Sequence, residues 1–298
     1  LGFHAVVFNP SDHDLVRGDP ATRRAYLDRV IAAEDVEYLK ALSRYQRLLE
    51  QRNAILKTDN RGAREVLIGF TEPLAQVAAI LALKRLEWLS RVKERLDNLV
   101  HQIAPHQPGL KLIFLSNWVP QIENLCIPNN NLGSVHFAGH GQLPSLENLE
   151  QAFWNQLSIL EAAEWRAGHS LVGPHRDDWS FFLGNQVLKG HGSQGEVRSA
   201  LLALKLSEIE LFRNATGHRP LFLLDDFSSE LDRERRSFLL RFLSESDLQV
   251  FVSTTEDSLG IGTNFPGRRY VVQNGKLDGI ERHDARLAEQ PSFEHKHG

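Results

Sequence analysis

The strongest constraint on the fold is the run Leu221-Phe222-Leu223-Leu224, which leads directly into Asp225 and Asp226. Four apolar residues without polar alternation are typical of a strand buried on both faces. Helical patterns and further apolar runs alternate with this strand, which predicts an α/β protein with a parallel sheet. Strands are expected at 3–8, 110–115, 179–183 and 248–254, and helices at 195–213 and 232–245.

Two carboxylates at the end of a buried strand are costly unless they serve a cation or a reaction. The pattern matches the Walker B motif of P-loop ATPases. Asp225 would then hold Mg²⁺ through its water shell, and Asp226 would orient or deprotonate the attacking water. Strand-terminal acids also cap helices or bind other metals, so the pattern alone leaves those alternatives open.

The flanking motifs favour the ATPase interpretation. Asp232 follows Walker B at the spacing of the D-loop of ABC-type ATPases, and Thr255 ends the next strand at the switch position. Upstream, Ser193-Gln194-Gly195 opens a helix, where a hydroxyl and free N–H groups form an anion site like the ABC signature loop. A lone Ser-x-Gly before a helix is more often an ordinary N-cap. The order of signature, Walker B, D-loop and switch is more specific than any one motif.

The first half of the chain is predicted to be largely helical. A basic helix follows Pro20, and residues 34–104 form two long helices separated by a polar break at 58–62. The second helix carries a narrow apolar seam, which predicts an antiparallel pair that projects as an arm, although a plain helix hairpin is the alternative. A loop is expected at 126–144 and a helix at 146–165. The seam consists of Leu89, Val92, Leu96, Leu99 and Ile103.

Composition excludes several classes of protein. The net charge is −4, with 34 Lys and Arg against 38 Asp and Glu, so any nucleic-acid surface must be local. The single cysteine, Cys126, excludes an internal disulfide and indicates a reducing, cytoplasmic location. No run approaches 18 uninterrupted apolar residues, so no membrane partner is expected.

Taken together, the motifs resemble the RecF family, ABC- and SMC-like ATPases of bacterial recombinational DNA repair. The resemblance extends from residue 5 to about 280. It is carried by the segments 7–12 and 23–28, Ser43-Arg44-Tyr45-Gln46-Arg47, Gln51-Arg52-Asn53-Ala54, Gly173-Pro174-His175-Arg176-Asp177-Asp178, and the run from Gly195 to Asp232.

The resemblance implies an ABC-type ATPase head with an inserted helical arm. The head would comprise 1–12 and 166–282 and the arm 13–165, and 283–298 would be a disordered tail. ATP would lie between two heads, with Ser193, Gln194, Gly195, Asp232 and Thr255 contacting nucleotide, so that ATP binding forms a homodimer. The implied role is to recognise gapped or junction DNA, with slow hydrolysis, and to assist recombinase loading with RecR and RecO.

Three departures from the family pattern bear on activity. The Walker A motif, Gly-x-x-x-x-Gly-Lys-Ser/Thr, does not occur in the sequence. In RecF proteins this motif lies upstream of the segment that corresponds to Leu1 of this chain. We therefore expect ATPase activity of the intact protein and leave that of this chain open. Glu196 stands where the signature usually has Gln, and Gly192 where ABC proteins usually have an apolar residue. Thr255 replaces the His of transporters, as RecF proteins tolerate.

Five arginines are candidates for DNA contact, and such contacts should be to phosphates and sensitive to salt. Acids interleave with them, so a solvated face of salt bridges is the alternative. The candidates are Arg23, Arg24, Arg44, Arg47 and Arg52.

Other functions remain open. A scaffold or DNA clamp could keep the ABC fold without hydrolysis, which Glu196 and the missing Walker A favour, whereas the pair Asp225 and Asp226 favours an ATPase. The head half of an SMC-like protein is a narrower alternative, because such chains return from a far longer coiled coil. The role of 173–178 is not determined by its sequence: Arg176 could lie near a phosphate, or the turn could be structural.

Overall fold

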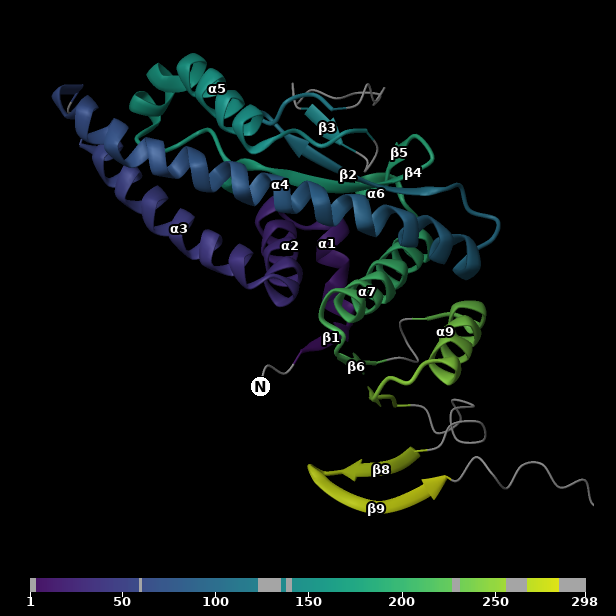
Figure 1. Ribbon diagram of the computed structural model, residues 1–298. Coiled ribbons are helices and arrows are strands. Elements are labelled where there is room, and N and C mark those ends of the chain that lie inside the picture. Colours follow the sequence, from purple (N-terminus) through teal and green to yellow (C-terminus); the bar gives the residue numbers. More distant parts are fainter. Residues whose placement is uncertain are drawn as a thin grey trace, which may run out of the picture.

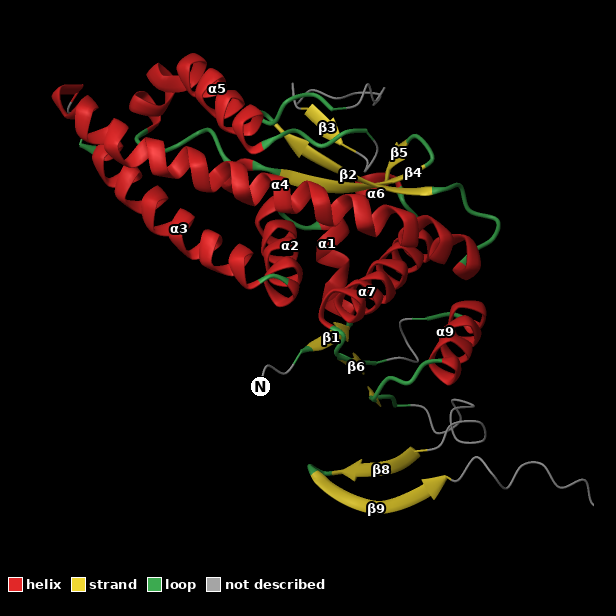
Figure 2. Ribbon diagram, viewed as in Figure 1, coloured by secondary structure: helices red, strands yellow, loops and turns green. Residues whose placement is uncertain are grey.

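The fold is described from a computed structural model of the chain, which places residues 4–58, 61–122, 135–137, 141–226, 231–255 and 267–283 (Figure 1). Helices dominate it, with a parallel sheet at one end and an antiparallel sheet beside the long helices (Figure 2). The predicted tail after residue 283 lies outside the described residues.

The parallel sheet brings together strands from the two ends of the chain. β1 (Ala5–Phe8), β6 (Leu221–Leu224) and β7 (Val250–Val252) pair in the order β1-β6-β7, and both pairs are parallel. Phe8 and Leu224 are paired in register. Every second residue of β1 and β6 is buried, and α7 (Gln194–Thr216) packs against β1. The predicted parallel α/β sheet is confirmed.

A second sheet is antiparallel, in the order β3-β2-β4-β5. Its central strands, β2 (Leu110–Ser116) and β4 (Asp178–Leu183), lie where strands were predicted. β4 pairs antiparallel with β2, so its expected place in the parallel sheet is wrong, because contacts with distant residues decide strand pairing. β3 (Val135–Phe137) falls within the predicted loop at 126–144, so that expectation is wrong for these three residues: they pair with the end of β2. A run this short has no pattern of its own, and backbone pairing with a distant strand decides its structure. β5 is Gln186–Val187.

Capping side chains and a glycine define several helix ends. The side chain of Asp35 caps α3 (Val36–Lys57), and that of Ser145 caps α5 (Leu146–Ala167). Gly168 ends α5 in the left-handed conformation, with φ 68°. The remaining helical elements are η1 (Pro10–His13), α1 (Asp14–Arg17), α2 (Pro20–Glu34), η2 (Arg61–Ala63), α4 (Arg64–Ile103), η3 (Pro174–Arg176), α6 (Leu188–His191) and α9 (Arg233–Glu245).

α4 is the central helix of the molecule, and the predicted seam describes only its second half. From Leu74 to Leu89 most residues are buried, because α3, α5, α7 and β2 all pack on α4 (Figure 1). An 18-residue window of α4 has a mean hydropathy of 1.8 and passes a length-and-composition test for a membrane span, but half of it is buried inside the molecule. The burial of α4 on several sides is that of the core helix of a globular protein.

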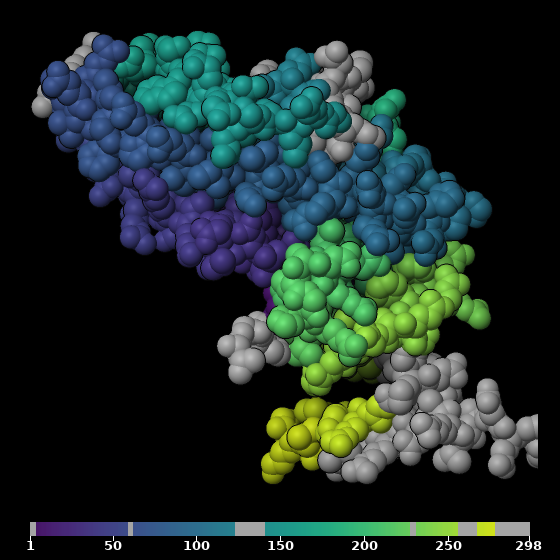
Figure 3. All heavy atoms as spheres, in the orientation of Figure 1, coloured from purple at the N-terminus to yellow at the C-terminus, as the bar shows by residue number. Residues whose placement is uncertain are grey.

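One hydrophobic core runs through the regions predicted as head and arm. It includes Phe8 and Leu224 of the parallel sheet, Leu81 of α4 and Phe153 of α5. The division into head and arm remains a prediction. β8 (Gly267–Gln273) and β9 (Lys276–His283) form a hairpin, with Asn274 and Gly275 at positive φ in its turn. The hairpin is the yellow part at the lower edge of the view in Figure 3.

Candidate functional site

The two acids of the Walker B pattern lie at the carboxyl end of the middle strand of the parallel sheet. The amide of Asp225 donates to the carbonyl of Phe8 on β1 at 2.9 Å, which extends the ladder one residue beyond β6. Asp226 then adopts φ 50°, so the chain turns sharply after the strand. The Asp225 side chain is exposed at this edge, where ligands of open α/β sheets bind.

Ser253, at the end of β7, holds both acids in place. Its hydroxyl donates to Asp225 Oδ1 at 2.6 Å and accepts from the amide of Asp226 at 3.0 Å. Its own amide donates to the carbonyl of Leu224 at 2.8 Å. The sequence analysis did not select Ser253, although its place at the end of the adjacent parallel strand was a usable signal. Thr255, two residues on, is exposed.

The signature segment opens α7 with a capping box. Ser193 Oγ accepts from the amide of Glu196 at 3.2 Å, and the Glu196 carboxylate accepts from the amide of Ser193 at 2.7 Å. Glu196 is thereby turned back onto its own helix terminus rather than outward. Ser193 and Gln194 are exposed at this end of the helix. The ordinary N-cap geometry is therefore present here alongside the features of an anion site.

Arg235 connects the signature helix to the segment after Walker B. Its Nε donates to Ser199 Oγ on α7 at 2.8 Å, and its guanidinium forms an ion pair with Asp232. A Cβ on Gly195 would lie 3.1 Å from Arg235 Nη2, so a glycine admits this close approach. Asp232 also caps α9 by accepting from the amide of Arg235. The predicted D-loop acid and the signature glycine are thus brought together.

The predicted site residues fall into two clusters. Asp225 and Asp226 meet at Ser253, whereas Ser193, Gly195 and Asp232 lie around the start of α7. Within the described parts of the chain, no hydrogen bond or ion pair joins Ser193 to Asp225.

The prediction of DNA contact is wrong for two of the five candidate arginines, because their side chains are buried. Arg52 is 1% exposed and donates to Thr71, Ser170 and Glu164, the last at 2.6 Å. Arg23 is 2% exposed and makes a two-pronged ion pair with Asp178, at 2.7 and 2.8 Å. Burial of an arginine requires such pairing, and its partners are distant in sequence.

The other three arginines reach the surface. Arg44 and Arg47 are exposed on α3, and Arg47 donates to Ser43 one turn earlier. Arg24 is half-buried and donates through Nη1 to the carbonyl of Asp177 at 2.9 Å. Their contact with DNA remains a prediction.

The segment Gly173-Pro174-His175-Arg176-Asp177-Asp178 ties α2, α3 and α4 to the antiparallel sheet. Asp177 is buried and accepts from Arg85 Nη1 at 3.2 Å and from Trp118 Nε1 at 3.0 Å. Burial raises the pKa of Asp177 to about 6, against the opposing effect of Arg85. Sequence reasoning missed Arg85, although a basic residue in the apolar stretch 74–89 was a signal for a buried ion pair.

His175 is a neutral member of this cluster. Its Nδ1 lies 2.7 Å from Tyr45 Oη and its Nε2 lies 3.0 Å from the carbonyl of Ser170. Burial lowers the pKa of His175 to about 4, and the charges of Arg176 and Arg24 act in the same direction. Most of this segment is therefore structural, and Arg176 is the exception because it is exposed.

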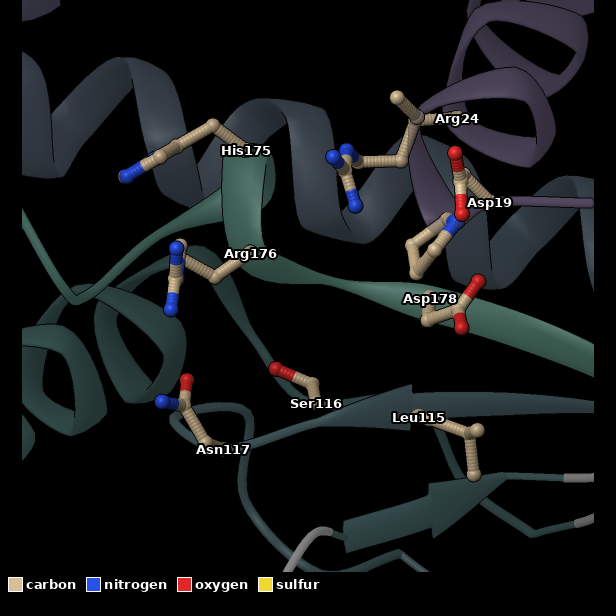
Figure 4. A pocket seen from close by; sticks show the side chains of 10 residues that line it. Asp19, Arg24, Leu115, Ser116, Asn117, His175, Arg176 and Asp178 are labelled. Atoms are coloured by element: carbon tan, nitrogen blue, oxygen red, sulfur yellow. The ribbon is translucent and has the colours of Figure 1, made fainter. Parts of the chain in front are cut away.

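A pocket of about 470 Å³ lies where this segment meets α2 and the end of β2 (Figure 4). Arg24, Arg176 and Asn117 line one part of it, and Asp19 and Asp178 another. A second hollow, of about 530 Å³, lies where α3 and α5 end, beside Lys57, Trp165 and Arg166.

The residues at the edge of the parallel sheet suit Mg²⁺. Asp225 has one carboxylate oxygen bonded to Ser253 and is exposed, so its other oxygen can accept from a metal-bound water. Mg²⁺ typically keeps several waters and takes one or two carboxylates plus substrate phosphates. Among the described residues, no group of three or more His, Cys, Asp or Glu side chains lies close enough to hold a metal ion.

Comparison with known proteins identifies relatives over nearly the whole chain. No family model matches it. The DNA replication and repair protein RecF of Geotalea uraniireducens is 34% identical over 292 residues, which cover 98% of this chain and 70% of the relative. That of Geobacter sulfurreducens is 38% identical over 280 residues, covering 94% and 66%. The chain thus spans about two thirds of the length of these relatives.

The fold agrees with that relationship. A solved structure described as the recombination mediator protein RecF-ATP in RecFOR pathway has a TM-score of 0.74 and 26% identity, covering 93% of this chain and 68% of that one. A second, described as RecF-ATPrS, gives a TM-score of 0.74 at 27% identity. The predicted fold class, a mixed helix and sheet protein with the parallel sheet of an ABC-type ATPase head, is thereby confirmed. The chain belongs to the RecF family of DNA replication and repair proteins.

Proposed function

We propose that the intact protein is an ATP-dependent DNA repair and recombination protein. It dimerises on gapped or junction DNA when ATP binds, hydrolyses ATP slowly and assists recombinase loading together with RecR and RecO in the cytoplasm. The observation that carries this proposal is the hydroxyl of Ser253, which bonds Asp225 and the amide of Asp226 at the edge of the parallel sheet. Family membership supports the DNA repair role.

The two acids take different roles in this proposal. Asp225 holds Mg²⁺ through water, and the ion supplies charge neutralisation at the phosphates. Asp226 orients the attacking water and accepts its proton, as a carboxylate beside the reacting phosphate can. The Ser253 hydroxyl fixes the Asp225 carboxylate and the backbone of Asp226, which supports a preorganised arrangement of this edge of the sheet.

The signature segment is proposed to act on the nucleotide held by the other subunit. Ser193, Gln194 and Gly195 are at an exposed helix N-terminus, where the free amides and the helix dipole favour a phosphate. The Glu196 carboxylate already occupies the amide of Ser193. Binding in this way therefore requires the capping box to open or the phosphate to use the neighbouring amides.

The capping box also supports a second candidate function. If the Glu196 carboxylate stays bonded to the amide of Ser193, the N-terminus of α7 carries a negative charge and that amide is not available to a phosphate. The protein would then act as a non-hydrolysing DNA-binding scaffold with the ABC fold.

Ser193→Arg in the full-length protein separates the two. We expect it to abolish ATP-dependent dimerisation, measured by light scattering after size exclusion, and to leave ATP binding by the monomer unchanged. Ser158→Arg is the matched control, because Ser158 is exposed on α5 and should leave dimerisation unchanged. A Ser193→Arg protein that dimerises like the wild type contradicts the proposed nucleotide sandwich.

A further inference from the structure

The pocket beside Arg176 is built from three parts of the chain. Asp19, Pro20, Ala21 and Arg24 come from the start of α2, Leu115 to Asn117 from the end of β2, and His175, Arg176 and Asp178 from the segment before and at the start of β4. Figure 4 shows the Arg24 side chain directed toward the side where His175 and Arg176 lie, with Asn117 near the end of Arg176.

The two guanidinium groups of the pocket have donors to spare. Arg176 is exposed and, among the described residues, its side chain makes no hydrogen bond or ion pair. Arg24 is anchored by one bond, from Nη1 to the carbonyl of Asp177. An arginine carries five N–H donors in a rigid fork, so an anchored Arg24 still presents a preorganised set.

The charges of the pocket favour an anion on the arginine side. Asp178 is neutralised by its paired bonds with the buried Arg23. His175 is held neutral at pH 7 by burial, which lowers its pKa to about 4. Asp19 is the remaining acid, and Arg24 and Arg176 together exceed its charge. Burial lowers the pKa of Arg24, and the nearby cations Arg85 and Arg176 act in the same direction, against the opposing charges of Asp178 and Asp177.

We propose that this pocket binds a backbone phosphate of a nucleic-acid strand, with Arg176 and Arg24 donating to the phosphate oxygens and Asn117 beside them. The inference rests on the proposed DNA-binding function and names a place where the strand is held. It also explains the exposed Arg176, which takes no part in the structural contacts of the segment 173–178.

A nucleic-acid strand suits the pocket better than a small ligand. Small-molecule sites enclose most of their ligand, whereas this pocket is open to the surface. Its donors are the two guanidinium groups, beside the Asn117 amide that also donates to the carbonyl of Leu171 at 3.4 Å, and such donors are usual in a phosphate contact that positions a strand without reading its sequence. Arginine matches the geometry of phosphate through two parallel N–H bonds.

The test measures binding of the chain to a fluorescent DNA duplex with a single-stranded tail, by anisotropy, without ATP and over a range of salt. Arg176→Gln should weaken binding about three- to tenfold at 0.1 M salt and reduce the salt slope by about one. In the described parts of the chain the Arg176 side chain has no hydrogen bond or ion pair to lose, so the thermal unfolding of the Arg176→Gln variant should match that of the wild type. Arg268→Gln is the control, because Arg268 is exposed on β8 and the variant makes the same charge change away from the pocket.

The outcomes separate this inference from the proposed function. If the wild type binds DNA and Arg176→Gln binds equally well with the same salt slope, the pocket is not a DNA site although the function stands. If the wild type binds no DNA, the pocket is not a DNA site, and the proposed function, in which the intact protein binds DNA together with ATP, is decided by the dimerisation of the Ser193→Arg protein. Inorganic phosphate and a polyglutamate peptide serve as competitors. If either one displaces DNA from the wild type, binds the wild type as tightly as DNA does and does not bind Arg176→Gln, the pocket is a site for a small anion or an acidic protein instead.

Discussion

Arg235 Nε donates to Ser199 Oγ at 2.8 Å, which joins the helix after Walker B to the signature helix. The same guanidinium pairs with Asp232, the cap of α9. A single side chain therefore connects the two segments that the proposed function places against nucleotide.

Replacing Arg235 should uncouple these two segments. We expect Arg235→Ala in the full-length protein to lower the ATP turnover rate more than the affinity for ATP, because the segments still exist but are no longer held together. The lost bonds should lower the free energy of unfolding by about 1–2 kcal/mol. Turnover at saturating ATP and urea unfolding measure the two effects. Arg235→Lys keeps the charge but cannot bond Ser199 and Asp232 at the same time, so its turnover rate should lie between those of the wild type and Arg235→Ala. Wild-type turnover in Arg235→Ala would contradict the coupling.

Asp226→Asn tests the catalytic acid. The amide keeps the shape of the side chain but cannot accept the proton of water. In the full-length protein we expect ATP-dependent dimerisation to persist and turnover to fall by about 100-fold or more. Steady-state phosphate release and light scattering on the same sample provide the measurement. Turnover at the wild-type rate would remove Asp226 from the catalytic role.

Arg52→Met should destabilise the fold rather than weaken DNA binding directly. It leaves the buried Glu164 carboxylate without its cation, which costs about 3–5 kcal/mol in comparable buried pairs. Equilibrium urea unfolding measures this loss. Arg44→Met makes the same change at an exposed position of α3 and should leave stability within about 0.5 kcal/mol of the wild type. The double variant Arg52→Met with Glu164→Leu should recover part of the loss, and equal stability of Arg52→Met and Arg44→Met would contradict the buried pair.

His175 should make the fold sensitive to mild acid. Its pKa is about 4 in the folded state, below the ordinary value of 6.5, so its contribution to stability is present above pH 6.5 and is lost as the pH falls toward 4. Asp177 acts in the opposite sense: its pKa is raised to about 6, so its contribution is present below 3.8 and is lost as the pH rises through 6.

Comparison with His175→Gln isolates the histidine, because Asp177 is common to both proteins. Between pH 7 and pH 5 the wild type should lose about 2 kcal/mol more unfolding free energy than the variant. Urea unfolding at the two pH values is the measurement. Parallel pH dependence in the two proteins would show that His175 is not buried as a neutral group.

Sequence patterns determined the elements and the order of the motifs, because these depend on local interactions. The apolar run before Asp225 predicted β6, Ser193 and Asp232 stand as the caps of α7 and α9, and Gly168 ends α5. Periodicity, caps and turn glycines act within a few residues, so each signal is complete in the sequence around it. The resemblance to the RecF family followed from the spacing of those same motifs.

Only the tertiary structure decided which charged residues are available to a ligand. Arg44 and Arg52 lie about two turns apart on α3, among similar charged neighbours, yet the first is exposed and the second is buried against Ser170 and Glu164. Likewise, Asp177 is sequestered by Arg85 and Trp118, while the adjacent Arg176 is left at the surface. A buried charge is tolerated only where distant segments supply its partner, and packing of α4 against its neighbours brings those segments together.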